Sequence, residues 1–328
     1  MRPVTVVLTI LNEAESLILL LESLAQQSRL PDEIVVVDGG STDGTIALLQ
    51  GFSTVIPLRL IVEEGANISR GRNLAIEAAR HDLIVTTDAG VRLAPEWLAR
   101  LTAPFEQPDP PDFVSGFFLP DPQGLWEHAL AMTTLPAVEE MGRGRFLPSA
   151  RSAAFTRQAW ARVGGYPEWM RWSEDVLFDL ALMNSGAKIV YEPEAVVWFR
   201  PRSTWRGFLK QYRNYAYGDG QGLLWPKRHL SRYLTYFMAL PLGLALLKRR
   251  PALGLALFAA SALAMFGTPL KRHWRRGAYR WRALPLIPLI RISGDLAKMW
   301  GFPQALAYGW RHRRQTRAYL EGAERQDP

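Results

Sequence analysis

The stretch Glu33-Ile-Val-Val-Val-Asp-Gly-Gly-Ser-Thr-Asp-Gly-Thr45 decides how the first part of this chain folds. Ile34 to Val37 is a β-branched run with the length expected for a strand that is buried on both faces. Asp38 stands where this strand must end, and Gly39-Gly40 allows a tight turn because neither residue has a Cβ. The stretch therefore predicts a carboxylate at the carboxyl end of a parallel strand, which is the edge where open α/β sheets bind ligands.

Strands and helices are predicted to alternate through the first 110 residues around this stretch. Ser41, Thr42 and Asp43 are helix N-cap residues by type, and they predict a short helix from about Thr45. The other predicted strands are 4–10, 58–62 and 83–87, and the other predicted helices begin near residue 13 and cover 68–79 and 95–101. This alternation indicates a mostly parallel, doubly wound sheet with helices on both faces.

Polar side chains follow three of these strands. Asp38 and Asp88 end two strands, and Thr9 with Asn12-Glu13 ends a third. A single aspartate at a strand end often only caps the next helix, but three polar strand ends at one sheet edge favour a binding site. The chain has neither a Gly-x-Gly-x-x-Gly nor a Gly-x-x-x-x-Gly-Lys-Ser/Thr motif, which disfavours a dinucleotide-binding fold and a P-loop NTPase.

Charge is distributed unevenly along the chain. The formal net charge is +8, but residues 1–199 carry 15 basic and 26 acidic residues, whereas residues 200–328 carry 24 basic and 5 acidic residues. A basic C-terminal third indicates either nucleic acid or an anionic membrane surface as a partner. The chain has no cysteine, so disulfides and thiolate chemistry are excluded.

Long apolar segments decide between these partners in favour of membrane lipids, so we expect no nucleic acid. They lie at about 233–247, 252–270 and 283–307, and the third is interrupted by Arg291, Asp295 and Lys298. A helix needs about 20 apolar residues to cross a bilayer, so we expect the second segment to be long enough, the first to be marginal and the third to lie at the interface or to re-enter. Two spans, a shallow hairpin and buried helices of a soluble domain all remain open. No signal peptide is expected, because Met1-Arg2-Pro3 leads directly into a strand.

Three motifs together resemble a family 2 glycosyltransferase with the GT-A fold, over roughly residues 4–220. They are Val7-Leu-Thr-Ile-Leu-Asn-Glu13, Ile34-Val-Val-Val-Asp-Gly-Gly-Ser-Thr-Asp-Gly-Thr45 and Ile84-Val-Thr-Thr-Asp-Ala-Gly90. The resemblance implies an α/β GT-A catalytic domain at 1–220 with a mixed, mostly parallel sheet. We expect residues 221–328 to add membrane-associated helices.

The resemblance also implies where a nucleotide sugar binds. The loop after Ile10 and the carboxylate of Asp38 would hold the base and ribose, and cations would hold the diphosphate. The residues that the resemblance places at this site are Thr9, Asn12, Glu13, Asp38, Ser41, Arg70, Arg72, Asn73 and Asp88.

The expected metal motif is incomplete. The family has Asp-x-Asp, whose second aspartate binds a divalent ion, but this chain has Asp88-Ala89-Gly90. Asp88 is therefore the one expected ligand for Mg²⁺ or Mn²⁺. A metal-binding histidine found in many relatives is also replaced by the segment 199–202, which leaves Arg200 and Arg202 as expected diphosphate contacts.

An acidic pair at the start of a predicted helix supplies the candidate catalytic group. Ser173 is the expected N-cap of the helix 176–184, which puts Glu174 and Asp175 in its first turn. Acidic residues there also complement the helix dipole without any catalytic role. The preceding Gly164-Gly165-Tyr166 makes the segment similar to the family's acceptor motif, so the resemblance implies Asp175 as general base and Glu174 as its orienting partner.

Further predictions concern segments outside these motifs. The segment 125–140 is predicted to be helical, 142–145 to be a basic loop, and 187–191 and 195–198 to be two short strands. The segment 204–217 is predicted to be an amphipathic helix that lies on the membrane or closes the site; its Gln211-Tyr212-Arg213-Asn214-Tyr215 is similar to a processive motif only imperfectly.

We therefore expect an inverting glycosyltransferase at the cell membrane, with its catalytic domain facing the cytoplasm. Its donor would be a UDP- or GDP-sugar, and its acceptor a hydroxyl on a lipid-linked or cell-envelope glycan. A nucleotidyltransferase that makes a sugar nucleotide, and a non-catalytic scaffold that binds one, are the alternatives.

Overall fold

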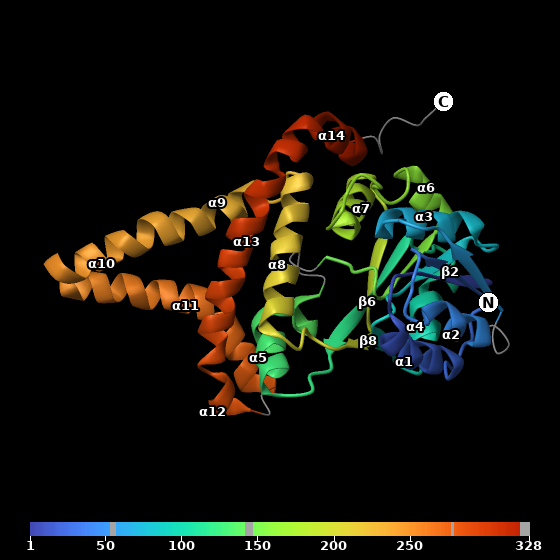
Figure 1. Cartoon of the computed structure of the whole chain (residues 1–328), viewed down its shortest axis with the longest axis horizontal. Coiled ribbons are helices and arrows are strands. Elements are labelled where there is room, and N and C mark those ends of the chain that lie inside the picture. Colours follow the sequence, from blue (N-terminus) through green and yellow to red (C-terminus); the bar gives the residue numbers. More distant parts are fainter. Residues whose placement is uncertain (53–56, 142–146, 277–278, 322–328) are drawn as a thin grey trace. The chain divides into compact units, whose positions relative to one another are not determined.

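The computed structural model describes residues 1–52, 57–141, 147–276 and 279–321 (Figure 1). The expected basic loop at 142–145 lies outside the described residues. The chain forms two compact units that alternate along the sequence. The sheet unit contains residues 1–119, 138–199 and 314–328, and the helical unit contains residues 120–137 and 200–313. The chain thus passes between the units several times, and the expected boundary near residue 220 falls within the helical unit.

The sheet unit contains one mixed eight-stranded sheet. Its strand order is β3 (Leu58–Val62), β2 (Glu33–Asp38), β1 (Val4–Ile10), β4 (Leu83–Thr86), β7 (Ala153–Thr156), β6 (Phe113–Pro120), β8 (Ile189–Phe199) and β5 (Val91–Leu93). The first four strands are parallel, β7 runs antiparallel to β4 and β6, and β5 runs antiparallel to β8. In the register of β1 and β2, Ile10 lies opposite Asp38, so both strands end at one edge.

Helices cover both faces of the sheet because strand residues alternate between the faces. On one face, Val6 and Leu8 pack with α1 (Ala14–Ala25), α2 (Thr45–Phe52) and α4 (Trp97–Thr102). On the other face, Val7 and Val35 pack with α3 (Ile68–Ala78), α6 (Arg157–Arg162) and α7 (Glu174–Asn184). The predicted α/β fold is confirmed.

Four local features differ from the predictions. The two short strands expected at 187–191 and 195–198 are one strand, β8, which runs through Pro193; that residue is exposed and precedes the part of β8 that pairs with β5. The three-residue strand β5 was not predicted. The helix expected at 125–140 ends as α5 (Leu125–Thr134), two residues before Pro136, and only a short 3₁₀ turn, η2 (Val138–Glu140), follows. Ser173 adopts a left-handed φ of 60° and makes no capping hydrogen bond through its side chain.

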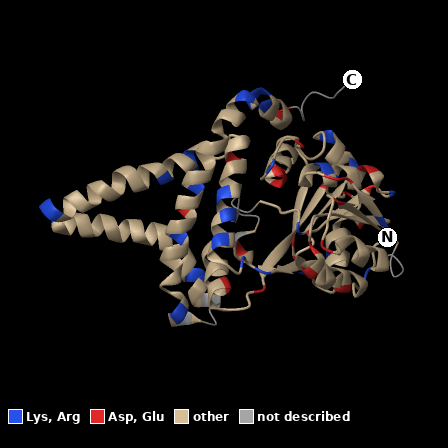
Figure 2. Ribbon diagram, viewed as in Figure 1, with Lys and Arg blue, Asp and Glu red and all other residues tan. Residues whose placement is uncertain are grey.

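Three helices form the core of the helical unit: α5, α8 (Trp205–Gln221) and α13 (Leu286–Arg311). Ala129, Phe208 and Ile290 meet in its apolar centre. The third apolar segment of the sequence is therefore one helix, α13, with many buried side chains. Figure 2 shows that the charged residues on the helices of this unit are mostly Lys and Arg, whereas most Asp and Glu lie on the sheet unit.

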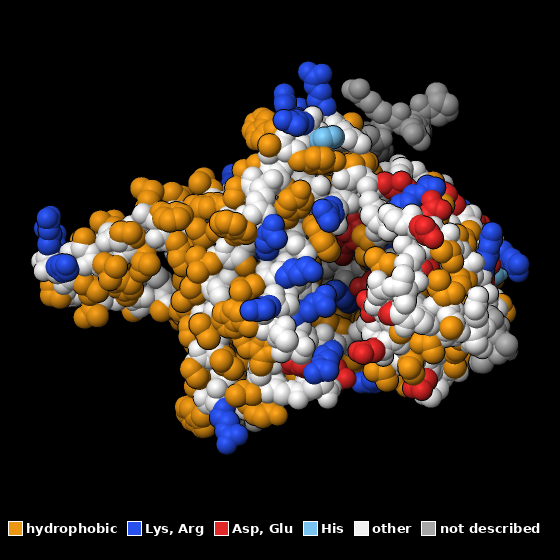
Figure 3. All heavy atoms as spheres, in the orientation of Figure 1, with side chains coloured by type: hydrophobic (Ala, Val, Ile, Leu, Met, Phe, Trp, Pro, Cys, Tyr) orange, Lys and Arg blue, Asp and Glu red, His pale blue; other side chains and the backbone are white. Residues whose placement is uncertain are grey.

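A helical hairpin extends from the helical unit. Its first arm is α9 (Pro226–Leu234), a π-helical turn η3 (Thr235–Ala239) and α10 (Leu240–Arg249); its second arm is α11 (Pro251–Arg276), and α12 (Arg280–Ala283) follows. Within the described residues, Pro226–Arg249 and Pro251–Trp274 are the two helices long and apolar enough to cross a membrane, with mean hydropathies of 1.3 and 1.8. Only 11% of each apolar window is buried, and hydrophobic side chains cover the hairpin surface (Figure 3).

The C-terminal helix α14 (Arg313–Glu321) returns the chain to the sheet unit. Tyr319 and Leu320 pack with the α7 side of the sheet core. The Tyr319 hydroxyl donates a 2.5 Å hydrogen bond to the carbonyl of Gly165. No sequence pattern indicated this return, because α14 has few apolar residues.

Candidate active site

Two loops at the end of β1 and β2 are joined by hydrogen bonds. The backbone N–H of Asn12 donates to the Ser41 hydroxyl at 2.8 Å, and the N–H of Thr42 donates to Asn12 Oδ1 at 2.9 Å. Asn12 adopts a left-handed φ of 54° to make this exchange. The structure thus brings Asn12 and Ser41 together, and both hold the loops in place.

Asp38 lies at the centre of these loops and is fully buried. Its Oδ1 accepts hydrogen bonds from the N–H groups of Gly40 and Ser41, at 2.8 and 2.7 Å. Its Oδ2 is buried and has no hydrogen-bond partner among the described residues. A buried carboxylate oxygen without a donor is costly, so this atom marks a place where a ligand can donate a hydrogen bond.

Thr9 and Glu13 have structural contacts in the same region. A Cβ on Gly71 would lie 2.7 Å from Thr9 Cγ2, so α3 packs closely on this threonine. The N–H of Glu13 donates to the Thr45 hydroxyl at 3.1 Å, and its carboxylate accepts from the Ser16 hydroxyl. Thr9 thus packs against α3, and Glu13 joins its loop to Thr45 through its backbone N–H.

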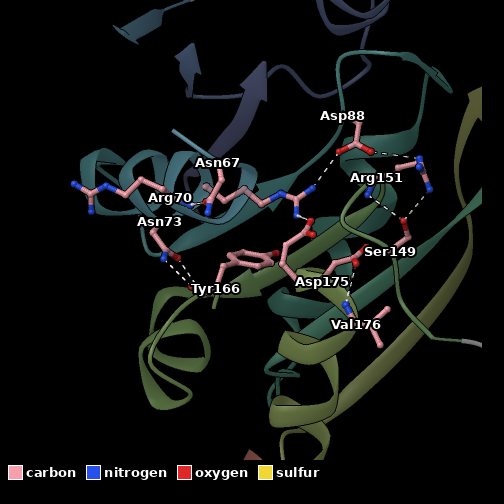
Figure 4. Close-up of polar contacts among 11 residues, drawn as sticks. Asn67, Arg70, Asn73, Asp88, Ser149, Arg151, Tyr166, Asp175 and Val176 are labelled. Atoms are coloured by element: carbon pink, nitrogen blue, oxygen red, sulfur yellow. Dashed lines mark hydrogen bonds and ion pairs between the residues drawn. The ribbon is translucent and has the colours of Figure 1, made fainter. Parts of the chain in front are cut away.

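Asp88 follows β4 and is held by two guanidinium groups (Figure 4). Its Oδ1 lies 3.3 Å from Arg72 Nη2, and its Oδ2 lies 3.3 Å from Arg151 Nε. The guanidinium of Arg151 also lies over the Phe199 ring, 5.0 Å from its centre. Arg151 was not predicted; it reaches Asp88 because β7, which begins two residues later, pairs with β4.

Arg72 connects Asp88 to the first turn of α7. Its side chain is only 5% exposed, and its Nη1 lies 2.8 Å from Glu174 Oε1. Its guanidinium lies 5.2 Å from the centre of the Tyr166 ring. Burial opposes the charged form, but the attraction of Glu174 and the neighbouring carboxylates outweighs it and the pKa of Arg72 is raised. Arg72 therefore stays positively charged inside a ring of carboxylates.

The first turn of α7 carries the acidic pair that the sequence indicated. Burial and the neighbouring Asp175 raise the pKa of Glu174, although Arg72 opposes this shift. Asp175 Oδ1 accepts a 2.9 Å hydrogen bond from the N–H of Val176. One turn later, burial raises the pKa of Asp179 well above its usual range. Asp179 was not predicted, because an acidic residue inside a helix usually faces solvent.

Asn73 and Arg70 have different surroundings from those of Arg72. Asn73 bonds both the N–H and the carbonyl of Tyr166, at 2.8 and 2.9 Å, and so fixes the Gly165-Tyr166 loop. The Arg70 side chain is partly exposed, lies 3.6 Å from Glu168 and extends away from Asp88 and Asp175 in Figure 4. The cluster around Asp88 therefore includes Arg72 but neither of its two predicted neighbours.

Arg200 and Arg202 belong to the helical unit. Arg200 forms a 2.7 Å ion pair with Glu127, which is buried. The carbonyl of Arg202 accepts a hydrogen bond from the Trp126 indole at 3.0 Å. The guanidinium of Arg200 is thus engaged by a carboxylate of its own unit.

The residues near Asp88 do not fit a divalent-metal site. Each oxygen of Asp88 already faces a guanidinium, and Gly90 offers no carboxylate. Across the described ranges, no group of three His, Asp or Glu side chains is arranged to hold a metal. The donor set, with one carboxylate between two cations, disagrees with the expectation of Mg²⁺ or Mn²⁺ at Asp88.

Family comparison gives two matches. The family described as "Glycosyl transferase family 2" matches residues 5–156. The family described as "Glycosyl transferase family group 2" matches residues 84–293, well over half of the chain.

Two curated relatives match this chain over less than two thirds of their own length. The O-antigen chain rhamnosyltransferase RfbN of Salmonella typhimurium is 27% identical over 54% of this chain and 60% of its own. The undecaprenyl-phosphate 4-deoxy-4-formamido-L-arabinose transferase of Yersinia enterocolitica is 34% identical over 32% of this chain and 34% of its own.

Solved structures share the fold over most of the chain. The mannosyltransferase PcManGT from Pyrobaculum calidifontis, in complex with GDP-Man and Mn²⁺, has a TM-score of 0.57 at 22% identity and covers 92% of this chain and 88% of its own. TarS 1-349 from S. aureus, in complex with UDP, has a TM-score of 0.52 at 16% identity and covers 95% of this chain and 91% of its own. Both similarities concern the fold.

Proposed function

Since this chain belongs to glycosyltransferase family 2 and has the GT-A fold, we propose that it transfers a sugar from a nucleotide-diphosphate donor to an acceptor hydroxyl with inversion. The observation that carries the proposal is the buried, unpartnered Oδ2 of Asp38 at the sheet edge that also carries the Asp88 cluster. A nucleoside offers imide and hydroxyl donors that such an oxygen accepts. The neighbours that carry GDP-Man and UDP support GDP and UDP as donor nucleotides.

Asp175 is the general base of this reaction. The acceptor oxygen attacks the anomeric carbon, its proton passes to the Asp175 carboxylate, and the bond from that carbon to the diphosphate oxygen breaks. Glu174 and Arg72 orient this first turn of α7 through their 2.8 Å ion pair. A positioned base contributes about 10²–10⁴-fold to such a transfer.

Arg151 supplies the positive charge that faces the diphosphate. A divalent ion in this fold would stabilise the leaving nucleoside diphosphate, but Asp88 lies between Arg72 and Arg151 and Gly90 lacks the second carboxylate. Arg151 is partly exposed, at 26%, and a guanidinium binds phosphate oxygens bidentately. No step of this mechanism passes through a metal.

The acceptor is a lipid-linked or cell-envelope glycan, at a membrane whose cytoplasmic side the sheet unit faces. Two observations support this: the exposed apolar hairpin, and relatives named for undecaprenyl-phosphate and O-antigen chain transfer. Nucleotide sugars are made in the cytosol, which is the reason for the orientation.

The test compares Asp175→Asn with Asp179→Asn, which lies one turn along the same helix. UDP- and GDP-sugars are incubated with the purified full chain and membranes, and released nucleotide and glycosylated product are measured. Asp175→Asn is expected to lower the transfer rate about 10²–10⁴-fold while UDP or GDP still binds, and Asp179→Asn is expected to keep a transfer rate close to that of wild type.

Three results would contradict the proposal. Unchanged transfer by Asp175→Asn removes its role as base. Nucleotide binding without any turnover supports a scaffold instead. Release of pyrophosphate from a nucleoside triphosphate and a sugar phosphate supports a nucleotidyltransferase.

A further inference from the structure

A small polar cavity opens in the helical unit where the hairpin begins. Its volume is about 150 Å³. Arg228, Arg232 and Tyr236 line it from the first arm of the hairpin, and Arg291 and Asp295 line it from α13. Three arginines thus face one carboxylate in a confined space.

Positive charge in this region exceeds the negative charge available to it. Residues 200–313 contain only two carboxylates, Asp219 and Asp295. Asp295 lies 2.9 Å from Arg232 Nε and 3.9 Å from Arg291 Nε, and Asp219 bonds His229 at 2.8 Å. Within the described residues, Arg228 forms no ion pair, and Arg291 Nε makes no hydrogen bond.

Lys298 shows the same excess of positive charge. Its ammonium lies over the Tyr212 ring, 4.6 Å from the ring centre, and is not paired with a carboxylate in the described part of the chain. Burial, together with Arg232 and Arg228, lowers the pKa of Lys298 to about 7. Neighbouring cations repel one another, and an anion that binds between them relieves this repulsion.

The surroundings of the cavity are apolar. The cavity begins within the first turn of the candidate span Pro226–Arg249, and Met265 of the opposite arm completes its wall. Beyond it, the hairpin exposes large side chains, with Phe237 70% and Leu263 75% exposed. Each arm of 24 residues is about 36 Å long at 1.5 Å per residue, more than a hydrocarbon core of about 30 Å. The cationic cavity therefore lies at the depth of lipid headgroups when the hairpin enters a bilayer.

We propose that this cavity binds the phosphate or diphosphate headgroup of a membrane lipid whose hydrocarbon chain lies along the apolar hairpin. Guanidinium groups of Arg228 and Arg291 donate to the phosphate oxygens, and the Tyr236 hydroxyl adds a neutral donor. The anion compensates the charge that Asp295 leaves unbalanced. This inference rests on the proposed function, because it gives a lipid-linked acceptor a place on the helical unit.

The test uses the full chain and the double variant Arg228→Gln/Arg291→Gln. Both side chains are at least partly exposed, and Arg291 approaches Asp295 only to 3.9 Å, so the fold is expected to survive. The matched control is Lys248→Gln/Arg249→Gln at the tip of the hairpin, which removes the same charge. Binding to neutral phosphatidylcholine vesicles is compared with binding to vesicles that also contain undecaprenyl phosphate or phosphatidylglycerol.

The double variant is expected to lose at least about tenfold more affinity for the phosphate-containing vesicles than the control loses, since it removes charge-assisted hydrogen bonds to the phosphate oxygens. Equal losses in the two variants would reduce the effect to general surface charge and overturn the proposal. Binding of inorganic phosphate as tight as that of the phosphate-containing vesicles would overturn it as well, because the lipid would then be unnecessary. Preference for undecaprenyl phosphate identifies the carrier lipid as the occupant, and equal binding to phosphatidylglycerol identifies an anionic phospholipid.

Two further readouts separate this proposal from the proposed function. UDP and GDP binding by the double variant is expected to equal that of wild type, which shows that the sheet unit is intact. If the double variant loses vesicle binding and the wild-type chain transfers no sugar, the cavity assignment stands and the catalytic proposal is refuted. If the double variant transfers sugar to an undecaprenyl-linked acceptor with unchanged KM, the catalytic proposal stands and the cavity assignment is refuted.

Discussion

Asp88 is a carboxylate whose two oxygens are both occupied by cations of its own chain. Arg72 approaches from α3 and Arg151 from the segment before β7, each at 3.3 Å. Two residues later, Gly90 leaves open space, because a Cβ there would meet nothing within 4 Å. We infer that the guanidinium of Arg151 takes the place of the carboxylate missing at Gly90 and of the metal that it would bind.

The double variant Gly90→Asp/Arg151→Gln tests this exchange. Wild-type affinity for UDP and GDP is expected to be nearly the same with EDTA as with MnCl₂. The double variant is expected to bind nucleotide at least about tenfold more tightly with MnCl₂ than with EDTA, since Asp88 and the carboxylate introduced two residues after it together offer the two ligands that a divalent ion uses. Calorimetric titration measures both, and Arg151→Gln alone serves as the control that weakens binding under both conditions. Nucleotide binding by wild type that requires MnCl₂ would contradict the role given to Arg151.

Asp179 provides a prediction about pH and stability. Its raised pKa means that the folded protein holds a proton there which the unfolded chain releases above the ordinary value of 3.8. The stability contributed by this group therefore falls as pH rises from about 4 toward the raised pKa, by at most about 1.4 kcal/mol per pH unit. Asp179→Asn cannot ionise, so its melting temperature is expected to rise relative to wild type between about pH 5 and about pH 7. Parallel pH profiles for the two proteins would contradict this assignment.

At the scale of single residues, the sequence indicated residues at the ends of strands. It did not indicate residues that are distant in the chain and become neighbours only when two strands pair. Asp38 was identifiable because a β-branched run and two glycines mark its strand end. Arg151 is distant from Asp88 in the chain and becomes its neighbour only when β7 pairs with β4. Ser173 occupies the predicted N-cap position of α7, but its side chain makes no capping hydrogen bond because its backbone is left-handed, which residue type alone does not reveal.

Among the elements, α14 contributes most that its sequence does not suggest. Tyr319 contacts Trp169 edge-on, with ring centres 5.2 Å apart, and its hydroxyl bonds the carbonyl of Gly165. Gly165 is a positive-φ residue whose loop also depends on Asn73. Through these contacts, α14 therefore supports the loop that leads to Glu174 and Asp175.

Tyr319→Phe removes only the hydroxyl and is expected to destabilise the protein by about 1 kcal/mol. In a unit of this size, that lowers the melting temperature by about 2–4 °C. The control, Arg317→Ala, breaks an exposed ion pair with Glu321 on the same helix and is expected to cost at most about 0.5 kcal/mol. Differential scanning calorimetry distinguishes the two, and equal melting temperatures for the two variants would show that the Gly165 contact has no weight.

Periodicity predicted the elements with many local contacts. The strands β1, β2 and β3 and the buried leucines of α1 lie close to where the patterns placed them. The strand β5 is only three residues long, too short for any pattern. The two strands predicted at 187–191 and 195–198 left a gap around Pro193, where β8 continues; this proline is exposed and precedes the pairing with β5.

At the scale of the whole molecule, the main features are the apolar hairpin and the opposite net charges of residues 1–199 and 200–328. The sequence showed both, because composition is independent of how the segments pack. It did not show that α5 joins α8 and α13, since those helices are distant in the chain. The way the two units share the chain is likewise a tertiary property.

The variant Phe237→Asp/Leu263→Asp tests the hairpin. Both side chains are at least 70% exposed, so folding alone does not require them to be apolar. Charged residues at the middle of a span cost about 2.5–3.5 kcal/mol each, and the variant is expected to move from the membrane fraction to the soluble fraction after carbonate washing. The control is Leu30→Asp on the sheet unit, where Leu30 is 53% exposed; it should not change the distribution. Retention of the Phe237/Leu263 variant in membranes would show that the hairpin is not the anchor.

The order in which the chain leaves the ribosome gives the position of α14 a final consequence. The sheet unit receives Tyr319 and Leu320 only from a segment that is synthesised after both arms of the hairpin. Until then the loop at Gly165 lacks its hydrogen bond from Tyr319, so the sheet unit is incomplete when both arms of the hairpin have already been synthesised. If the hairpin enters a membrane as it is synthesised, its insertion would thus precede completion of the sheet unit.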